Sequence, residues 1–242
     1  MYAFRWLTLG WRDLMRAPLP SLLHGAAVTI GGWIILGITI RYWYLLPGAF
    51  SGFLLVGPIL ATGLYAVSRD IEQVRTSGIR EVIAAWRRGT RPLVGLGLML
   101  VLAATAWVLV SAVLFGLFLD APITGIDSIL HRIVLSEGSF LFPVWITLGG
   151  FGAALVFAAT AVSAPMLLDR NVDIVTAIAT SVRAVGANPI TMVLWAVIIM
   201  VTTGIALLTL MLGFMIVVPV IGHGTWHAYR DIVDASELPV RL

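Results

Sequence analysis

The chain contains no cysteine and no lysine, and only 11% of its 242 residues are charged, whereas 60% are hydrophobic. The absence of cysteine excludes disulfides, thiolate metal ligands and thiol catalysis. A soluble domain has about 25% charged and about 45 to 50% apolar residues, so an ordinary soluble protein is excluded. We therefore predict an integral membrane protein of the all-α class that forms a single domain over residues 1–242.

Sequence motifs of common enzymes are also missing. The chain has neither the G-x-S-x-G pattern of hydrolases nor the H-E-x-x-H pattern of metalloproteases. Acidic residues are confined to loops and helix ends, whereas ion-coupled transporters and proton relays usually need an ionisable group near the bilayer midplane. We predict that the protein is not an enzyme and that no charged substrate passes through its centre.

The apolar runs predict six transmembrane helices when each run is closed at its charges and turn residues. The last two need a turn between them, because the 40 residues of 190–229 would form a helix of about 60 Å, twice the hydrocarbon thickness. We place that turn near Leu210 to Gly213. The six predicted spans are residues 19–40, 44–67, 92–119, 140–168, 190–209 and 212–229.

The fifteen basic residues, all arginine, are distributed unequally between the loops. Only Arg41 and Arg132 fall on one side of the predicted membrane, and the other thirteen fall on the opposite side. Because arginine-rich loops remain in the cytoplasm, we predict a multi-pass protein of a bacterial inner membrane with both termini cytoplasmic. The sequence pI of about 9.8 then reflects arginines near lipid headgroups and predicts no nucleic-acid partner.

Three segments on the arginine-rich side have the periodicity of amphipathic helices. They cover residues 4–16, 79–89 and 172–185, and a proline that opens a span follows each of them. In the first, one face carries Phe4, Leu7, Trp11 and Leu14, and another carries Arg5, Arg12 and Arg16. Such helices lie in the plane of the membrane interface. We predict three cytoplasmic interfacial helices.

The second and sixth predicted spans align without a gap. Pro58 matches Pro219, 161 positions later, and the triplet Arg69-Asp70-Ile71 matches Arg230-Asp231-Ile232 in the same register. This predicts an internal repeat of one interfacial helix followed by a transmembrane hairpin. The repeat units are about 1–75, 76–171 and 172–242.

Three of the four histidines could lie together at the arginine-rich side. His223 and His227 are four residues apart on one helix face, and His24 is at a similar depth in the first span. Two imidazoles with this spacing can hold a metal, so a haem or copper site is one interpretation. The alternative is that the histidines bond to carbonyls, Arg230, Asp231 or headgroups, because no carboxylate within the spans could support a ligand. No cofactor is therefore the first expectation.

The pairs Arg69-Asp70 and Arg230-Asp231 stand at equivalent ends of the aligned spans. Together with Arg87 and Arg88, they are predicted to contact anionic lipid headgroups or a membrane-protein partner. The alternative is a charged stop at the headgroup boundary with a local ion pair, which stabilises little when it is exposed.

Four segments resemble one known family: GWRDLMRAPLPSLLHG, GPILATGLYAVSR, SAPMLLDRNVDIVTAIATSVRAVGANP and VVPVIGHGTWHAYRDIV. Together they are similar to bacterial predicted integral membrane proteins that are catalogued only as a domain of unknown function. Some members of this family are labelled as cytochrome c oxidase components. The resemblance extends over nearly the whole chain. It implies an inner-membrane protein with a respiratory connection, and it supplies no site residues.

Three functions from different classes follow from these patterns. The first is a non-catalytic scaffold or assembly factor, linked to respiratory complexes, with the lipid bilayer and membrane proteins as partners. The second is a protein that handles haem or copper through His24, His223 and His227. The third is a transporter of a small neutral or lipid-like solute, which the repeat and the prolines in the spans favour.

Overall fold

The computed structural model describes residues 2–75, 91–119, 124–135 and 140–241, and these residues form helices joined by turns and loops. Besides the helices, one isolated bridge joins Arg170 and Val240. The all-α prediction is confirmed. Within the described residues, four segments are long and apolar enough to cross a membrane, and the count of six stays a prediction. The four are Pro18–Thr39, Arg91–Phe118, Leu141–Asp169 and Pro189–Leu208.

Contacts divide the chain into two compact units, each built from separate stretches of sequence. Unit 1 comprises residues 1–30, 58–97 and 157–242, and unit 2 comprises residues 31–57 and 98–156. These boundaries do not coincide with the three predicted repeat units. The repeat and the single domain therefore stay predictions, and each unit is described by itself.

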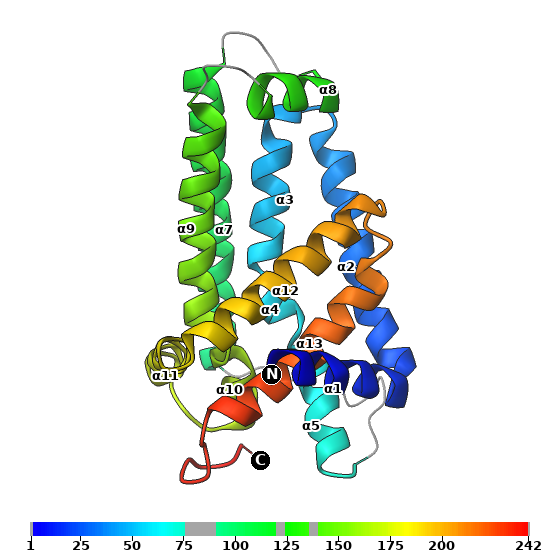
Figure 1. Cartoon of the computed structure of the whole chain (residues 1–242), viewed down its shortest axis with the longest axis vertical. Helices are drawn as coiled ribbons and strands as arrows, with labels where there is room; N and C mark the ends of the chain where they lie inside the picture. The colour runs from blue at the N-terminus through cyan, green and yellow to red at the C-terminus, as the bar shows by residue number, and fades with distance from the viewer. Residues whose placement is uncertain (1, 76–90, 120–123, 136–139, 242) are drawn as a thin grey trace. The chain divides into compact units, whose positions relative to one another are not determined.

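In unit 1, α1 packs along α13, and α13 also packs against α5 and α12 (Figure 1). The N-terminal part of α2 and the short helix α10 belong to the same unit. The amphipathic patterns of residues 4–16 and 172–185 form helices as predicted, while residues 79–89 lie outside the described residues. The helices that lie largely or partly in unit 1 are α1 (Tyr2–Arg16), α2 (Pro18–Thr39), α4 (Gly57–Leu60), α5 (Thr62–Glu72), α10 (Ser163–Asp169), α11 (Ile174–Ala187), α12 (Pro189–Leu208) and α13 (Phe214–Ile232).

The predicted turn between the last two spans is present. Leu210 and Met211 adopt positive φ angles of 52° and 69° between the end of α12 and the start of α13. The hydroxyl of Thr209 accepts a hydrogen bond from the Gly213 amide at 2.9 Å. Because this turn has no charged side chain, the apolar run continues through it without a break in hydropathy.

Two predicted spans are interrupted close to a proline. The segment 44–67 becomes η1 (Trp43–Leu45), α3 (Leu46–Leu55), α4 and α5, with the interruption beside Pro58. Likewise α9 (Leu141–Thr160) is separated from α10 shortly before Pro165. Proline lacks an amide proton and its ring clashes with the carbonyl four residues earlier, so helices break on the N-terminal side of it. Pro219, in contrast, lies within the continuous helix α13.

Unit 2 contains α3, most of α7 (Arg91–Phe118), α9, and the short elements α8 (Ile126–Ile129) and η2 (Leu130–Val134). Gly48 and Gly52 of α3 lie against α7: a Cβ atom on Gly48 would be 2.9 Å from the Cβ of Ser111. The indole of Trp107 donates to Ser51 at 2.6 Å. Close backbone approach with neutral hydrogen bonds is how helices associate in membranes.

Candidate functional site

Helix α1 has a buried face that packs on α13. Its buried positions include Ala3, Trp6 and Gly10, and Asp13 follows on the same face. The two helices touch at their glycines, because a Cβ atom on Gly10 would lie 2.8 Å from the amide nitrogen of Gly224. The face with Phe4 and Trp11 is distinct from this one and stays exposed, so α1 has two apolar faces rather than one.

Asp13 is an acid on that buried face, with 3% of its surface exposed. Its Oδ2 atom accepts a hydrogen bond from the Ser68 hydroxyl at 2.7 Å and lies 2.8 Å from Nε2 of His227. Burial raises the pKa of this carboxyl, but the bonds from His227 and Ser68 lower it by more, so the pKa lies below its usual value. Asp13 is thus a carboxylate at neutral pH.

His223 is completely buried on α13 and bonded at both ring nitrogens. Nδ1 lies 2.8 Å from the Ser68 hydroxyl, and Nε2 lies 2.9 Å from the Ser21 hydroxyl. A continuous chain of polar atoms therefore joins α1, α2, α5 and α13. We call it the histidine network, and it consists of Asp13, Ser21, Ser68, His223 and His227.

The proton positions in the histidine network follow from the number of donors. Ser68 uses its single proton for Asp13, so Nδ1 of His223 must carry a proton and donate to Ser68. In a neutral imidazole Nε2 then accepts from Ser21. The Ser21 hydroxyl is also 2.6 Å from the Ala17 carbonyl, and its single proton can serve only one of these two acceptors. If Ser21 donates to the Ala17 carbonyl, Nε2 of His223 must be protonated as well and donate to Ser21. The tautomer is thus set by the carboxylate of Asp13, through Ser68.

The predicted metal ligands do not converge in this arrangement. Both nitrogens of His223 are engaged by serines, His227 is bonded to Asp13, and Nδ1 of His24 lies 2.8 Å from the Pro20 carbonyl. Among the described residues, no three His, Cys, Asp or Glu side chains are grouped so that they could hold a metal ion. The haem or copper site stays a prediction that the geometry does not support.

The residues predicted to contact headgroups or partners mostly connect segments of unit 1. Arg230 binds the carboxylate of Glu72 at 3.1 Å, and Asp231 accepts from the Trp6 indole at 2.7 Å. Arg69 donates to the Leu168 carbonyl at 3.0 Å. Asp70 binds Arg75 at 2.7 Å, and Arg87 and Arg88 lie outside the described residues. The paired charges at the two aligned helix ends are therefore used for internal packing.

Asp13, Ser21 and Ser68 are members of the network that the residue patterns did not identify. The sequence does contain a signal for Asp13. Asp13 follows Gly10 by three residues and Trp6 by seven, so it lies with them on a helix face made of small and aromatic residues. An acid on such a face needs a buried partner. Serine hydroxyls in helices carry no such signal, because they usually bond to their own helix.

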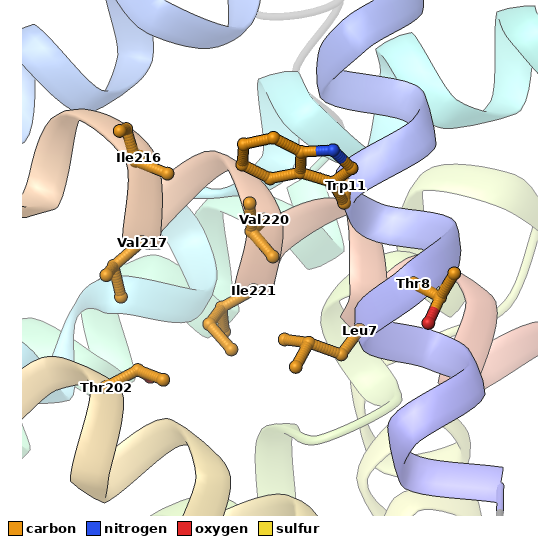
Figure 2. A pocket seen from close by; sticks show the side chains of 8 residues that line it. All are labelled: Leu7, Thr8, Trp11, Thr202, Ile216, Val217, Val220 and Ile221. Atoms are coloured by element: carbon orange, nitrogen blue, oxygen red, sulfur yellow. The ribbon is translucent and has the colours of Figure 1, made fainter.

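The second feature of unit 1 is an open cavity of about 390 Å³ between α1, α12 and α13, which we call the α1 groove. Figure 2 shows Trp11 over one end and Thr202 at the other, with the aliphatic side chains of α13 between them. The two threonine hydroxyls donate to carbonyls of their own helices, at Phe4 and Ile198. The surface of the groove is therefore almost wholly apolar. Its lining residues are Leu7, Thr8, Trp11, Thr202, Ile216, Val217, Val220 and Ile221.

The helices beside the α1 groove expose further apolar side chains. On α12, Met200 is 66% exposed and Ile205 55% exposed, and on α1 the exposed fraction of Met15 is 62%. Since α12 is one of the candidate membrane spans, its exposed apolar side chains would contact the lipid bilayer. One wall of the α1 groove is thus formed by a candidate membrane span.

Comparison with known proteins places the middle of the chain in a family. The model of a family described as predicted integral membrane protein, DUF2189, matches residues 45–169, which include Ser68 but neither α1 nor α13. No curated protein and no solved structure matches the chain. The resemblance of the four sequence segments to this kind of family extended over nearly the whole chain, whereas the family model covers about half of the chain. The chain belongs to the DUF2189 family of predicted integral membrane proteins.

Proposed function

We propose that the protein is a non-catalytic, multi-pass membrane protein that binds a lipid-like molecule in the α1 groove. The observation that carries this proposal is the apolar cavity between α1, α12 and α13. Its volume of about 390 Å³ lies at the lower end of the range of small-molecule sites, roughly 300 to 1,000 Å³. Of the three functions considered from the sequence, the geometry favours the one with a lipid-like ligand.

The chemistry of the lining selects against polar ligands. Because the hydroxyls of Thr8 and Thr202 already donate within their helices, they can offer a ligand only acceptor sites, and most bonds of a polar ligand to water would be lost without replacement. An unpaired polar group of this kind costs about 1 to 3 kcal/mol. A hydrocarbon chain has no such groups, so it enters the groove without this penalty.

The histidine network supports the proposal because it attaches α1, one wall of the groove, to α13, another wall. Leu7, Thr8 and Trp11 are on α1, whereas four other lining residues are on α13. Asp13 and the glycine contact between Gly10 and Gly224 attach α1 to α13. A cavity whose walls are fixed before binding loses less conformational entropy when a ligand enters.

Substitution of Val217 tests the proposed groove. Val217→Trp should fill it, and Val197→Trp, on an exposed part of α12 outside the lining, is the matched control. The full chain is purified in mild detergent and titrated with phosphatidylcholine under native mass spectrometry. We expect one bound lipid on the wild type and the control, and loss of that lipid from Val217→Trp. Equal binding by all three proteins would exclude the groove as the site.

A second proposal is the orientation in a bacterial inner membrane, with both termini cytoplasmic. Thirteen of fifteen arginines support it, and α1 and the C-terminal residues belong to the same unit. Because the chain lacks cysteine, Thr124→Cys and Ser236→Cys each give a single label site. An impermeant maleimide should label position 124 in intact spheroplasts and position 236 only after permeabilisation. The reverse pattern would invert the topology.

A scaffold or assembly function remains a second candidate, and the outer surface of α1 favours it. Tyr2 is 61% exposed and Phe4 51% exposed on a helix that the network holds in place. Such a surface suits a membrane-protein partner, and the link to respiratory complexes stays a prediction. Co-purification from native membranes with wild type but not with Tyr2→Ser/Phe4→Ser would support this function. Recovery of the same subunits with both proteins would exclude α1 as the contact.

A further inference from the structure

The affinity of the α1 groove needs a source other than the hydrophobic effect. In a bilayer, an acyl chain that enters an apolar groove leaves surroundings that are equally apolar, so the transfer contributes little. A lipid held there must therefore be selected through its headgroup. This inference rests on the proposed lipid function, and it concerns the rim of the groove rather than its lining.

The rim on α1 is basic. Thr8, a lining residue, has Arg5 three positions before it and Arg12 four positions after it, which places both arginines beside it on the helix surface. The helix thus has three sectors in order around its axis: the buried face with Asp13, the apolar face with Trp11 towards the groove, and the arginines. Arginines next to an apolar face are typical of a helix at the depth of lipid phosphates.

The positive charge on this rim is only partly balanced by the nearby acids. Asp13 is buried with Ser68 and His227. Asp231 accepts a hydrogen bond from the Trp6 indole at 2.7 Å and also forms an ion pair with Arg5 at 3.4 Å, and 59% of the Arg5 side chain is exposed. Arg12 is exposed and has no ion pair within the part of the chain that the structure describes. Because an exposed ion pair stabilises little, the guanidinium group of Arg5 can also bind an anion, and that of Arg12 can turn towards one.

We propose that the α1 groove holds one acyl chain of an anionic phospholipid, whose phosphate lies beside Thr8 between Arg5 and Arg12. Guanidinium groups bind phosphate oxygens through paired, charge-assisted hydrogen bonds. The acyl chain runs from this point along the aliphatic side chains of α13, past Val220 and Val217 (Figure 2). The arginines thus bind the phosphate of the lipid, and the apolar cavity binds its acyl chain.

The test compares phosphatidylglycerol with phosphatidylcholine carrying the same acyl chains. Each lipid is titrated into the full-length protein in detergent, and its Kd is measured by native mass spectrometry. One arginine near an anionic surface contributes about 1 kcal/mol, which corresponds to about fivefold in Kd. We expect the wild type to bind phosphatidylglycerol roughly 5- to 25-fold more tightly than phosphatidylcholine. The variant Arg5→Gln/Arg12→Gln should lose this preference and keep its Kd for phosphatidylcholine.

The control is Arg183→Gln, which removes one exposed arginine from α11 and should leave the preference unchanged. Thermal unfolding of each variant verifies that it is folded. Equal Kd values for the two lipids in the wild type, or an unchanged preference in the double variant, would overturn the phosphate site.

Failure of the groove itself would look different from failure of the phosphate site. If the groove is not the site, Val217→Trp should bind phosphatidylcholine as the wild type does, regardless of the lipid preference of Arg5→Gln/Arg12→Gln. Millimolar inorganic phosphate should not displace phosphatidylglycerol from the wild type. Displacement would show a site for free phosphate, and it would overturn the assignment to a lipid.

Discussion

Units 1 and 2 are both built from apolar helices, but their helices are held together by different polar contacts. In unit 2, neutral indoles donate to serines, Trp107 to Ser51 and Trp145 to Ser111. In unit 1, a carboxylate and two imidazoles form the histidine network. Neutral pairs stabilise modestly and do not depend on pH, whereas a buried carboxylate is costly once its partner is lost. Unit 1 is therefore where protonation and single substitutions should matter most.

The largest expected effect is the loss of His223. His223→Ala leaves Ser21 and Ser68 without their shared partner in a site from which water is excluded. Ser21 keeps the Ala17 carbonyl and Ser68 keeps Asp13, so the cost comes from the lost bonds and from the cavity left in a fully buried site. We expect a loss of about 3 kcal/mol, because large-to-small substitutions in a core cost about 2 to 5 kcal/mol. Hydrogen exchange should show the loss in α1 and α13 and not in α7 or α9. Equal loss of protection in both units would contradict the contrast between them.

Gly10 should be the next most sensitive position. Gly10→Ala places a methyl group against the backbone of α13, and such overpacking costs about 1 to 3 kcal/mol. Gly186→Ala is the matched control, because a Cβ atom there meets nothing within 4 Å. That control should be neutral or stabilising by up to about 1 kcal/mol, since alanine favours helix. Thermal unfolding measures both, and equal midpoints for the two variants would show that α1 does not contact α13 through Gly10.

In unit 2, Trp107→Phe removes one neutral hydrogen bond and keeps an aromatic ring. We expect a loss of about 1 kcal/mol, the usual net value of such a bond. The effect should be confined to hydrogen exchange in α3 and α7. A loss as large as that of His223→Ala would mean that the neutral bonds hold the helices as strongly as the histidine network does.

The pH dependence of stability should distinguish the two units. The folded-state pKa of Asp13 lies below its unfolded value of about 3.9, so its contribution is complete above that pH. It is lost as the pH falls through the folded-state pKa. Wild-type protein should therefore lose α1 protection on acidification below about pH 4, and Asp13→Asn should lose less over the same range. Parallel curves for the two proteins would show that another group titrates.

The smallest effect is expected for metal content. Because the described histidines bond to serines, Asp13 and a carbonyl, His223→Ala/His227→Ala should have the same haem and copper content as the wild type. Elemental analysis and a visible absorption spectrum of protein from native membranes measure this. A Soret band or stoichiometric copper that disappears in the variant would restore the cofactor hypothesis.

Hydropathy and charge by themselves determined the class of the protein and much of its local structure. The apolar runs located α2, α7 and α12, and the amphipathic periods located α1 and α11. The length of the last apolar run was sufficient to place the turn at Leu210 and Met211. These features depend on local sequence and on the thickness of a bilayer, both of which a single sequence contains.

Only the tertiary structure decided how the helices use their faces. Lipid and protein interior are both apolar, so hydrophobicity cannot distinguish the side of α1 that packs on α13 from the side that carries Trp11. The partners of His223 come from α2 and α5, more than 150 positions away. The α1 groove likewise needs three helices, and no segment contains it alone. Contacts between distant segments depend on which backbones can approach closely, and here Gly10 and Gly224 permit that approach.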